Sequence, residues 1–87
     1  MTPAERTYQL KRAVLRALDD CGGYVVREEV VRDQAALKVD YLAPTTAELD
    51  AALRTIDEER LAVALPTERG RKLGLTDAGR LWLAQNR

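Results

Sequence analysis

The sequence predicts an α+β fold that is mainly α, with three or four helices and a β-hairpin in the C-terminal half. Two observations predict it: apolar residues recur at helical spacing along much of the chain, and Leu61–Leu65 and Leu73–Leu75 alternate with a period of two. Pro66 and Gly70 lie between the alternating segments, as in a turn. With 87 residues, the chain is long enough for one domain and too short for two, so we expect a single domain over residues 1–87.

The first predicted helix begins near Pro3, whose fixed φ suits a first helical turn, and ends before Gly22 and Gly23. Its apolar positions follow helical spacing: Leu10, Ala13, Val14, Ala17 and Leu18. Basic residues fall on the other side and are expected to face solvent: Lys11, Arg12 and Arg16. This helix is therefore amphipathic.

A short strand and two further helices are expected next. Residues 24–26 (YVV) are aromatic and β-branched, which favours a strand, and residues 28–37 form a shorter helix followed by a loop over residues 38–43. Thr45 and Glu48 have the spacing of a capping box, which marks the start of a third helix. Its apolar stripe is the clearest in the chain: Leu49, Ala52, Leu53 and Ile56.

The predicted hairpin pairs Leu61–Leu65 with Leu73–Leu75 across a polar, basic turn region. We expect these apolar side chains on the core side: Leu61, Val63, Leu65, Leu73 and Leu75. Thr76 is the expected N-cap of a last helix. Gly79 would allow that helix to pack closely, and Trp82 would anchor it in the core.

This order of elements resembles a winged helix-turn-helix domain. Residues 45–65 are similar to a recognition helix followed by the first strand of a wing, and residues 75–80 (LTDAGR) are similar to the segment after the wing in MarR-like and PadR-like bacterial regulators. Residues 23–26 (GYVV) resemble the small strand before the second helix. The resemblance implies a winged helix that binds double-stranded DNA as a small bacterial or phage transcriptional regulator.

The sequence departs from that family in three places. No glycine lies between the third helix and the hairpin, where Glu59, Arg60 and Leu61 stand, so a left-handed turn there would cost about 1 kcal/mol. The loop over residues 38–44 is longer than in a compact helix-turn-helix. The long extra helices with which such regulators dimerise are missing, and we expect a monomer or a weak homodimer.

The composition excludes several classes of function. The chain has no histidine and no serine, which removes the common nucleophile–base pairs, so we expect no enzyme activity. The single cysteine, Cys21, argues against a disulfide framework and, without histidine, against a zinc site; no cofactor or metal is expected. No apolar run is long enough to span a membrane and no signal peptide is visible, so a cytoplasmic protein is the expectation.

The charges are balanced overall and unevenly distributed. Residues 1–18 and 61–87 each carry a net charge of +3, whereas residues 19–43 and 44–60 each carry −3. If the third helix enters the major groove, its outward residues are the expected DNA contacts: Thr46, Ala47, Ala51 and Arg54. The hairpin would add phosphate contacts from Arg69, Arg71 and Lys72. The acidic residues of the third helix, such as Asp50 and Glu58, favour the alternative of a protein–protein interaction module.

Overall fold

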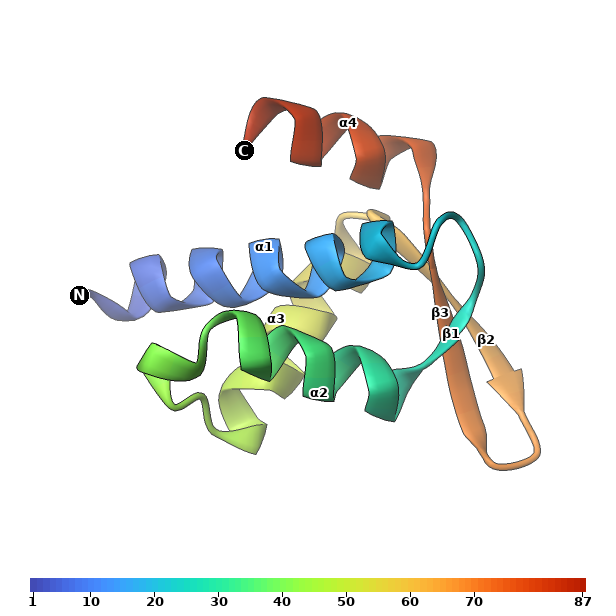
Figure 1. The fold of residues 1–87 in the computed structure, drawn as a ribbon, viewed down its shortest axis with the longest axis horizontal. Coiled ribbons are helices and arrows are strands. Elements are labelled where there is room, and N and C mark those ends of the chain that lie inside the picture. Colours follow the sequence, from blue (N-terminus) through green and yellow to red (C-terminus); the bar gives the residue numbers. More distant parts are fainter.

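A computed structural model describes all 87 residues and shows the predicted mainly helical α+β fold, a winged helix (Figure 1). The elements along the chain are α1 (Pro3–Asp20), β1 (Val26–Arg27), α2 (Glu28–Lys38), the 3-10 helix η1 (Asp40–Leu42), α3 (Thr46–Glu58), β2 (Ala62–Thr67), β3 (Gly70–Leu75) and α4 (Asp77–Gln85). The three strands form one antiparallel sheet in the order β1-β3-β2.

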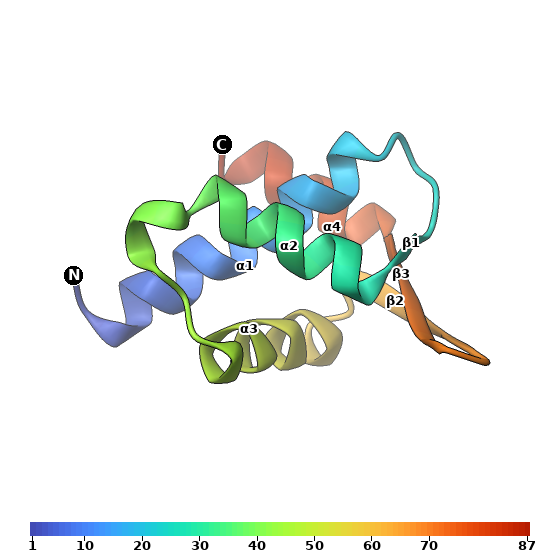
Figure 2. The same cartoon turned by 60° about the horizontal axis from the view of Figure 1, so that its bottom comes forward.

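Helix α1 is the centre of the molecule. It contacts α2, α3, α4 and β3, and its buried side chains form the largest part of a single core of 18 apolar residues. Figures 1 and 2 show α2 and α4 on different sides of α1, with α3 on a third side. In both views the β2–β3 hairpin projects from one end of the helices, so α3 and the hairpin are both open to a partner.

The start of α3 is fixed by contacts that the sequence predicted and by one that it did not. The Thr45–Glu48 capping box is present, as expected. In addition, the Arg6 guanidinium on α1 donates two hydrogen bonds to the Glu48 carboxylate, at 2.7 and 3.0 Å, and one to the Leu42 carbonyl at 2.8 Å. The hydrogen bonds from Arg6 and from the Thr45 backbone lower the pKa of Glu48 to about 2. Arg6 therefore fixes α3 against α1.

The hairpin forms where it was predicted, but the expected core face of β2 is wrong. Val63 and Leu65 are 47% and 46% exposed, whereas Ala62 and Ala64 point inward, opposite Leu75 and Leu73. The strand begins one residue later than expected, because Leu61 is still part of the turn that ends α3. A shift of one residue exchanges the two faces of a strand. Small alanines on β2 also leave room for the large leucines of β3.

A left-handed residue ends α3, at the position where the sequence lacks the usual glycine. Arg60 has φ +58°, and the backbone N–H groups of Arg60 and Leu61 donate to the carbonyls of Asp57 and Ile56, each at 3.0 Å. This is a Schellman motif with arginine in place of glycine. The left-handed turn is thus made without a glycine.

Two local expectations need correction. Of residues 24–26, only Val26 joins the sheet, together with Arg27, whereas Tyr24 and Val25 are exposed. The expected loop over residues 38–43 contains η1, and it is not simply a surface loop because Val39 and Leu42 are buried. The apolar side chains of Val39 and Leu42 hold this connection onto the core.

Helix α4 packs against α1 and against the turn after α3. A Cβ atom added to Gly79 would lie 2.1 Å from the Leu61 carbonyl oxygen, so the close packing expected at this glycine is confirmed. Trp82 is half-buried, with its ring centroid 5.8 Å from that of Tyr8. Lys11 was expected to face solvent but is only 9% exposed: its ammonium lies 4.7 Å from the centroid of the Trp82 ring and 2.8 Å from the Glu59 carboxylate. No helix has the length and apolarity that crossing a membrane requires.

Candidate nucleic-acid interface

The outer face of α3 is exposed along its length. Its inner face is the apolar stripe identified in the sequence, and all four stripe residues are buried. The outward residues named from the sequence are all exposed: Thr46, Ala47, Ala51 and Arg54. On the open side of this helix, Arg54 therefore lies one turn from Ala51 and also one turn from the acidic residues Asp50, Asp57 and Glu58.

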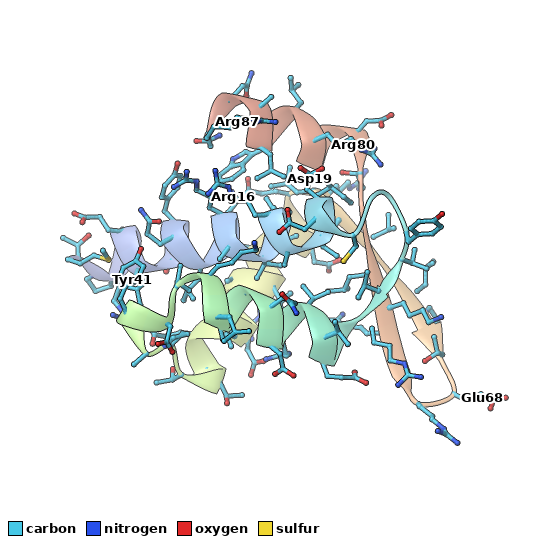
Figure 3. The ribbon with its side chains drawn as sticks, in the orientation of Figure 1. Arg16, Asp19, Tyr41, Glu68, Arg80 and Arg87 are labelled. Atoms are coloured by element: carbon cyan, nitrogen blue, oxygen red, sulfur yellow. The ribbon has the colours of Figure 1, made fainter.

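The tip of the hairpin is smaller than the sequence suggested. Only Glu68 and Arg69 lie between the paired residues Thr67 and Gly70, and Arg69 is exposed. Figure 3 shows Glu68 at this tip. Arg71 and Lys72 belong to β3 and point to opposite faces of the sheet, so only Arg69 of the three predicted basic residues lies in the turn itself.

The charge of Arg71 is engaged within the fold. Its guanidinium donates from Nε and Nη2 to Oε1 of Glu28, at 2.9 and 2.6 Å, across 43 positions of sequence. The hydrogen bond to Glu28 raises the pKa of Arg71 above its ordinary value, so the arginine stays charged. The charge of Arg71, one of the predicted phosphate contacts, is therefore compensated by Glu28.

Glu28 begins a chain of ion pairs that continues to α3. Arg32 lies 3.9 Å from Glu28 on the next turn of α2 and also forms an ion pair with Asp50 of α3. Beside this chain, α2, α3 and β3 enclose an open hollow of about 310 Å³, lined by Arg32, Asp50, Leu53, Arg54, Asp57 and Arg71. The negative charge of Asp50 is thus compensated by an arginine.

Arg27 is a basic residue of this surface that was not predicted from the sequence. Arg27 on β1 lies opposite Lys72 on β3, and the two side chains share the outer face of the sheet. Both line a hollow of about 290 Å³ beside the tip of the hairpin, together with Glu29, Thr67, Glu68, Arg69 and Arg71. Strand alternation would have placed Arg27 here if the predicted strand had been extended by one residue.

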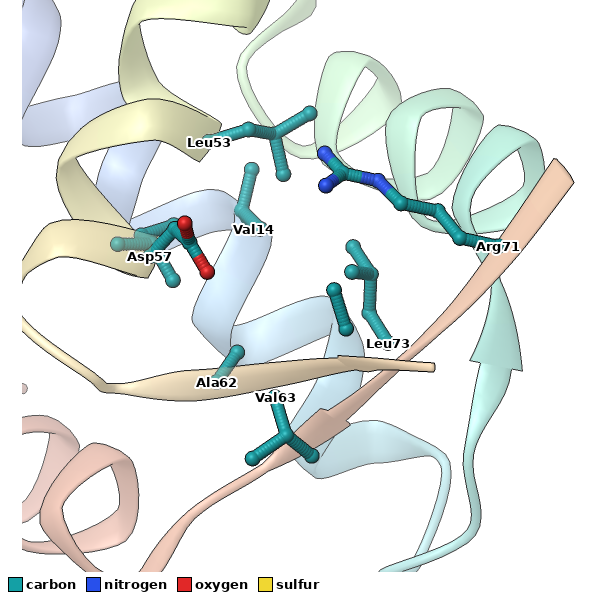
Figure 4. A pocket seen from close by; sticks show the side chains of 9 residues that line it. Val14, Leu53, Asp57, Ala62, Val63, Arg71 and Leu73 are labelled. Atoms are coloured by element: carbon teal, nitrogen blue, oxygen red, sulfur yellow. The ribbon is translucent and has the colours of Figure 1, made fainter. Parts of the chain in front are cut away.

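The remaining small cavity does not form a ligand site. The space between α3 and the sheet, shown in Figure 4, measures about 10 Å³, which is the size of one water molecule, and its lining is mostly apolar. No group of three or more His, Cys, Asp or Glu side chains is placed to hold a metal ion.

Comparisons with known proteins leave the site to be judged on its geometry, since no family model, curated protein or solved structure matches the chain.

Proposed function

We propose that this domain binds duplex DNA, with α3 in the major groove and the β2–β3 hairpin against the neighbouring backbone. The observation that carries the proposal is the exposed face of α3, which presents Arg54 and the small side chains of Ala47 and Ala51, next to a projecting hairpin with a basic tip residue. A helix can approach base edges closely when its outward side chains are small. A transcriptional regulator of the MarR-like or PadR-like kind is the proposed context.

Arg54 is the proposed base contact. It takes part in none of the ion pairs of the structure and is exposed, so its guanidinium is available for bidentate hydrogen bonds to guanine. Ala47 and Ala51 are the proposed partners of thymine methyl groups, and Thr46 lies at the N-terminus of α3, where backbone N–H groups favour a phosphate.

The proposed phosphate contacts are few. Arg69 lies in the turn of the hairpin, and Lys72 and Arg27 line the same hollow beside its tip. With about three or four phosphates neutralised, binding should weaken only gradually with added salt, because each contact releases about 0.9 counterions.

Fluorescence anisotropy with a labelled duplex library at low salt tests the proposal. Arg54→Ala should cost about 1–3 kcal/mol of binding free energy on the preferred sequence and relax the preference at one base pair. Arg69→Ala should weaken binding to all sequences alike. Arg87→Ala, which removes the same charge from the C-terminus, is the matched control and should leave binding unchanged.

A second function is favoured by one further observation. The outer face of the sheet exposes Val63 and Leu65, and Val25 lies beside Val63 over Gly74. Exposed apolar side chains of this kind suit a protein partner. Non-specific DNA binding is expected at about 10 μM protein in 50 mM salt. If the protein binds no duplex under those conditions, we would replace the DNA proposal with a protein-interaction function.

A further inference from the structure

A second basic surface lies on α1, far from the proposed DNA contacts. It is a hollow of about 250 Å³ between α1, the C-terminal end of α2 and η1. Three cationic side chains line the hollow, those of Arg12, Arg16 and Lys38. The aromatic ring of Tyr41 and the amide of Gln9 also line it, and no carboxylate does. Figure 3 shows Tyr41 beside the first half of α1 and Arg16 further along the same helix.

The geometry of α1 separates this hollow from α3. Arg12 and Arg16 are one turn apart and therefore lie on the same face of the helix. Each is about 160° around the helix axis from Val14, which is fully buried and lines the cavity beside α3. A ligand in the hollow would thus occupy the side of the domain opposite the α3 face.

The cations of the hollow have unused hydrogen-bonding capacity. Neither Arg12 nor Arg16 takes part in an ion pair, and the Nε atom of Arg12 is buried without a hydrogen-bond partner. A buried N–H group without an acceptor is unfavourable, and an anion would satisfy it. Lys38 bonds Asp20 at 2.6 Å and retains two further donors.

We propose that this hollow binds a small phosphate monoester that carries a planar ring, the class to which nucleoside monophosphates belong. Arg12 and Arg16 bind the phosphate, because planar guanidinium groups match its oxygens. Tyr41, which is 71% exposed, stacks on the ring. The volume is just below the roughly 300–1,000 Å³ of pockets for drug-sized ligands, so it suits one phosphate and one ring system. Towards α4 the neighbouring hollow contains Asp19 and Asp20, which keeps the phosphate at the Arg12 end.

The test is an NMR titration that follows the arginine Nε–H signals of the intact chain at constant ionic strength. AMP should shift the signals of Arg12 and Arg16 saturably, and inorganic phosphate should shift the same signals more weakly. Adenosine, which has the ring without the phosphate, should shift neither. The signal of Arg54, on the opposite face, should not respond to AMP.

Variants separate the roles of the side chains. The double variant Arg12→Gln, Arg16→Gln should weaken AMP binding by about tenfold or more, the size expected when charge-assisted hydrogen bonds are lost. Arg54→Gln is the matched control and should bind AMP like the unmodified chain. Tyr41→Ala should weaken AMP binding and leave phosphate binding unchanged. Circular dichroism of each variant establishes that it is folded, and Arg16→Gln alone, at an exposed position, serves if the double variant is not.

Three results would overturn the proposal. The first is the absence of a saturable shift with millimolar AMP in the unmodified chain. The second is AMP binding that the arginine variants leave intact. The third is a duplex that shifts the Arg12 and Arg16 signals while AMP does not, which would make this face a contact for a nucleic-acid backbone. Because Arg54 reports on the other face, failure here is distinguishable from failure of DNA binding through α3.

Discussion

Gly79 is the residue whose replacement the fold tolerates least. An added Cβ atom would lie 2.1 Å from the Leu61 carbonyl oxygen and 2.7 Å from Cδ1 of Leu75, and the carbonyl belongs to backbone that cannot move independently. Gly79→Ala should therefore lower the free energy of unfolding by about 1–3 kcal/mol or more, since overpacking usually costs this much. Urea unfolding followed by circular dichroism measures it.

Gly74→Ala provides the comparison for that experiment. Its added Cβ would meet only the side chains of Val25 and Val63, at 3.0 and 3.5 Å, on the exposed face of the sheet. Those side chains can rotate away, so the loss should be smaller than at Gly79. Equal losses at the two glycines would contradict the proposed tight contact between α4 and the turn after α3.

Arg60 offers the opposite effect, a substitution that stabilises the fold. At φ +58° an arginine is strained and a glycine is not. Arg60→Gly should raise the free energy of unfolding by about 0.5–1 kcal/mol, after allowance for the greater freedom of glycine in the unfolded chain. Ala51→Gly, at an exposed position within α3, should instead lower it by a similar amount. The melting temperatures of the two variants should change in opposite directions. A lower melting temperature for Arg60→Gly would contradict backbone strain at Arg60.

At the scale of elements, α3 depends on Glu48 for its attachment to α1. The pKa of Glu48 is lowered to about 2 from an ordinary 4.5, so the folded state favours the charged carboxylate. The stability contributed by this group is present above about pH 4.5 and is lost as the pH falls towards 2. Glu48→Gln should thus destabilise the domain at pH 7, and the difference from the unmodified chain should shrink across that acid range.

Chemical denaturation at a series of pH values measures this effect. Glu58→Gln, on the same helix but outside any ion pair, is the control and should cause no loss at neutral pH. A Glu48→Gln deficit that stays constant down to pH 2 would show that the carboxylate charge is not what Arg6 recognises.

The elements also show which features the sequence could predict. The start and the inner face of α3 follow from local signals, namely the capping box and a stripe with helical period, and both are confirmed. Which side chains of β2 point to the core depends on one residue, Arg60. Its left-handed turn makes the strand begin one residue later than predicted. The engagement of Arg71 depends on Glu28, 43 residues away, which no local pattern contains. The exposure of the four outward residues of α3 was therefore predictable, whereas the ion pair of Arg71 with Glu28 was not.

At the scale of the whole molecule, the uneven charges compensate one another through tertiary contacts. Residues 1–18, with a net charge of +3, provide Arg6 and Lys11, which pair with acids of the −3 segment 44–60. Arg71, in the other positive segment, pairs with Glu28 in the other negative one. Segment charge read along the sequence is therefore a poor guide to surface charge in this domain.

The apolar surface supports one further prediction, about association. The most exposed large apolar side chains are distributed over different parts of the chain, at the first residue, in the loop before β1, on α2, on η1 and on α4: Met1, Tyr24, Leu37, Tyr41 and Leu81. Scattered residues of this kind do not make a dimer interface, and Val25, Val63 and Leu65 on the outer face of the sheet form only a small apolar patch. We therefore expect a monomer or a weak homodimer in sedimentation at micromolar concentration, and a tight dimer under those conditions would contradict this.

The position of Trp82 has a spectroscopic consequence. The chain has one tryptophan, and it contacts Tyr8 and Lys11 of α1 from α4. Its fluorescence emission thus reports whether the last helix is docked, whereas far-ultraviolet dichroism reports all the helices together. The two signals will change together during unfolding only if α4 remains in place until the rest of the domain is lost. A chain this small thereby contains its own probe of cooperativity.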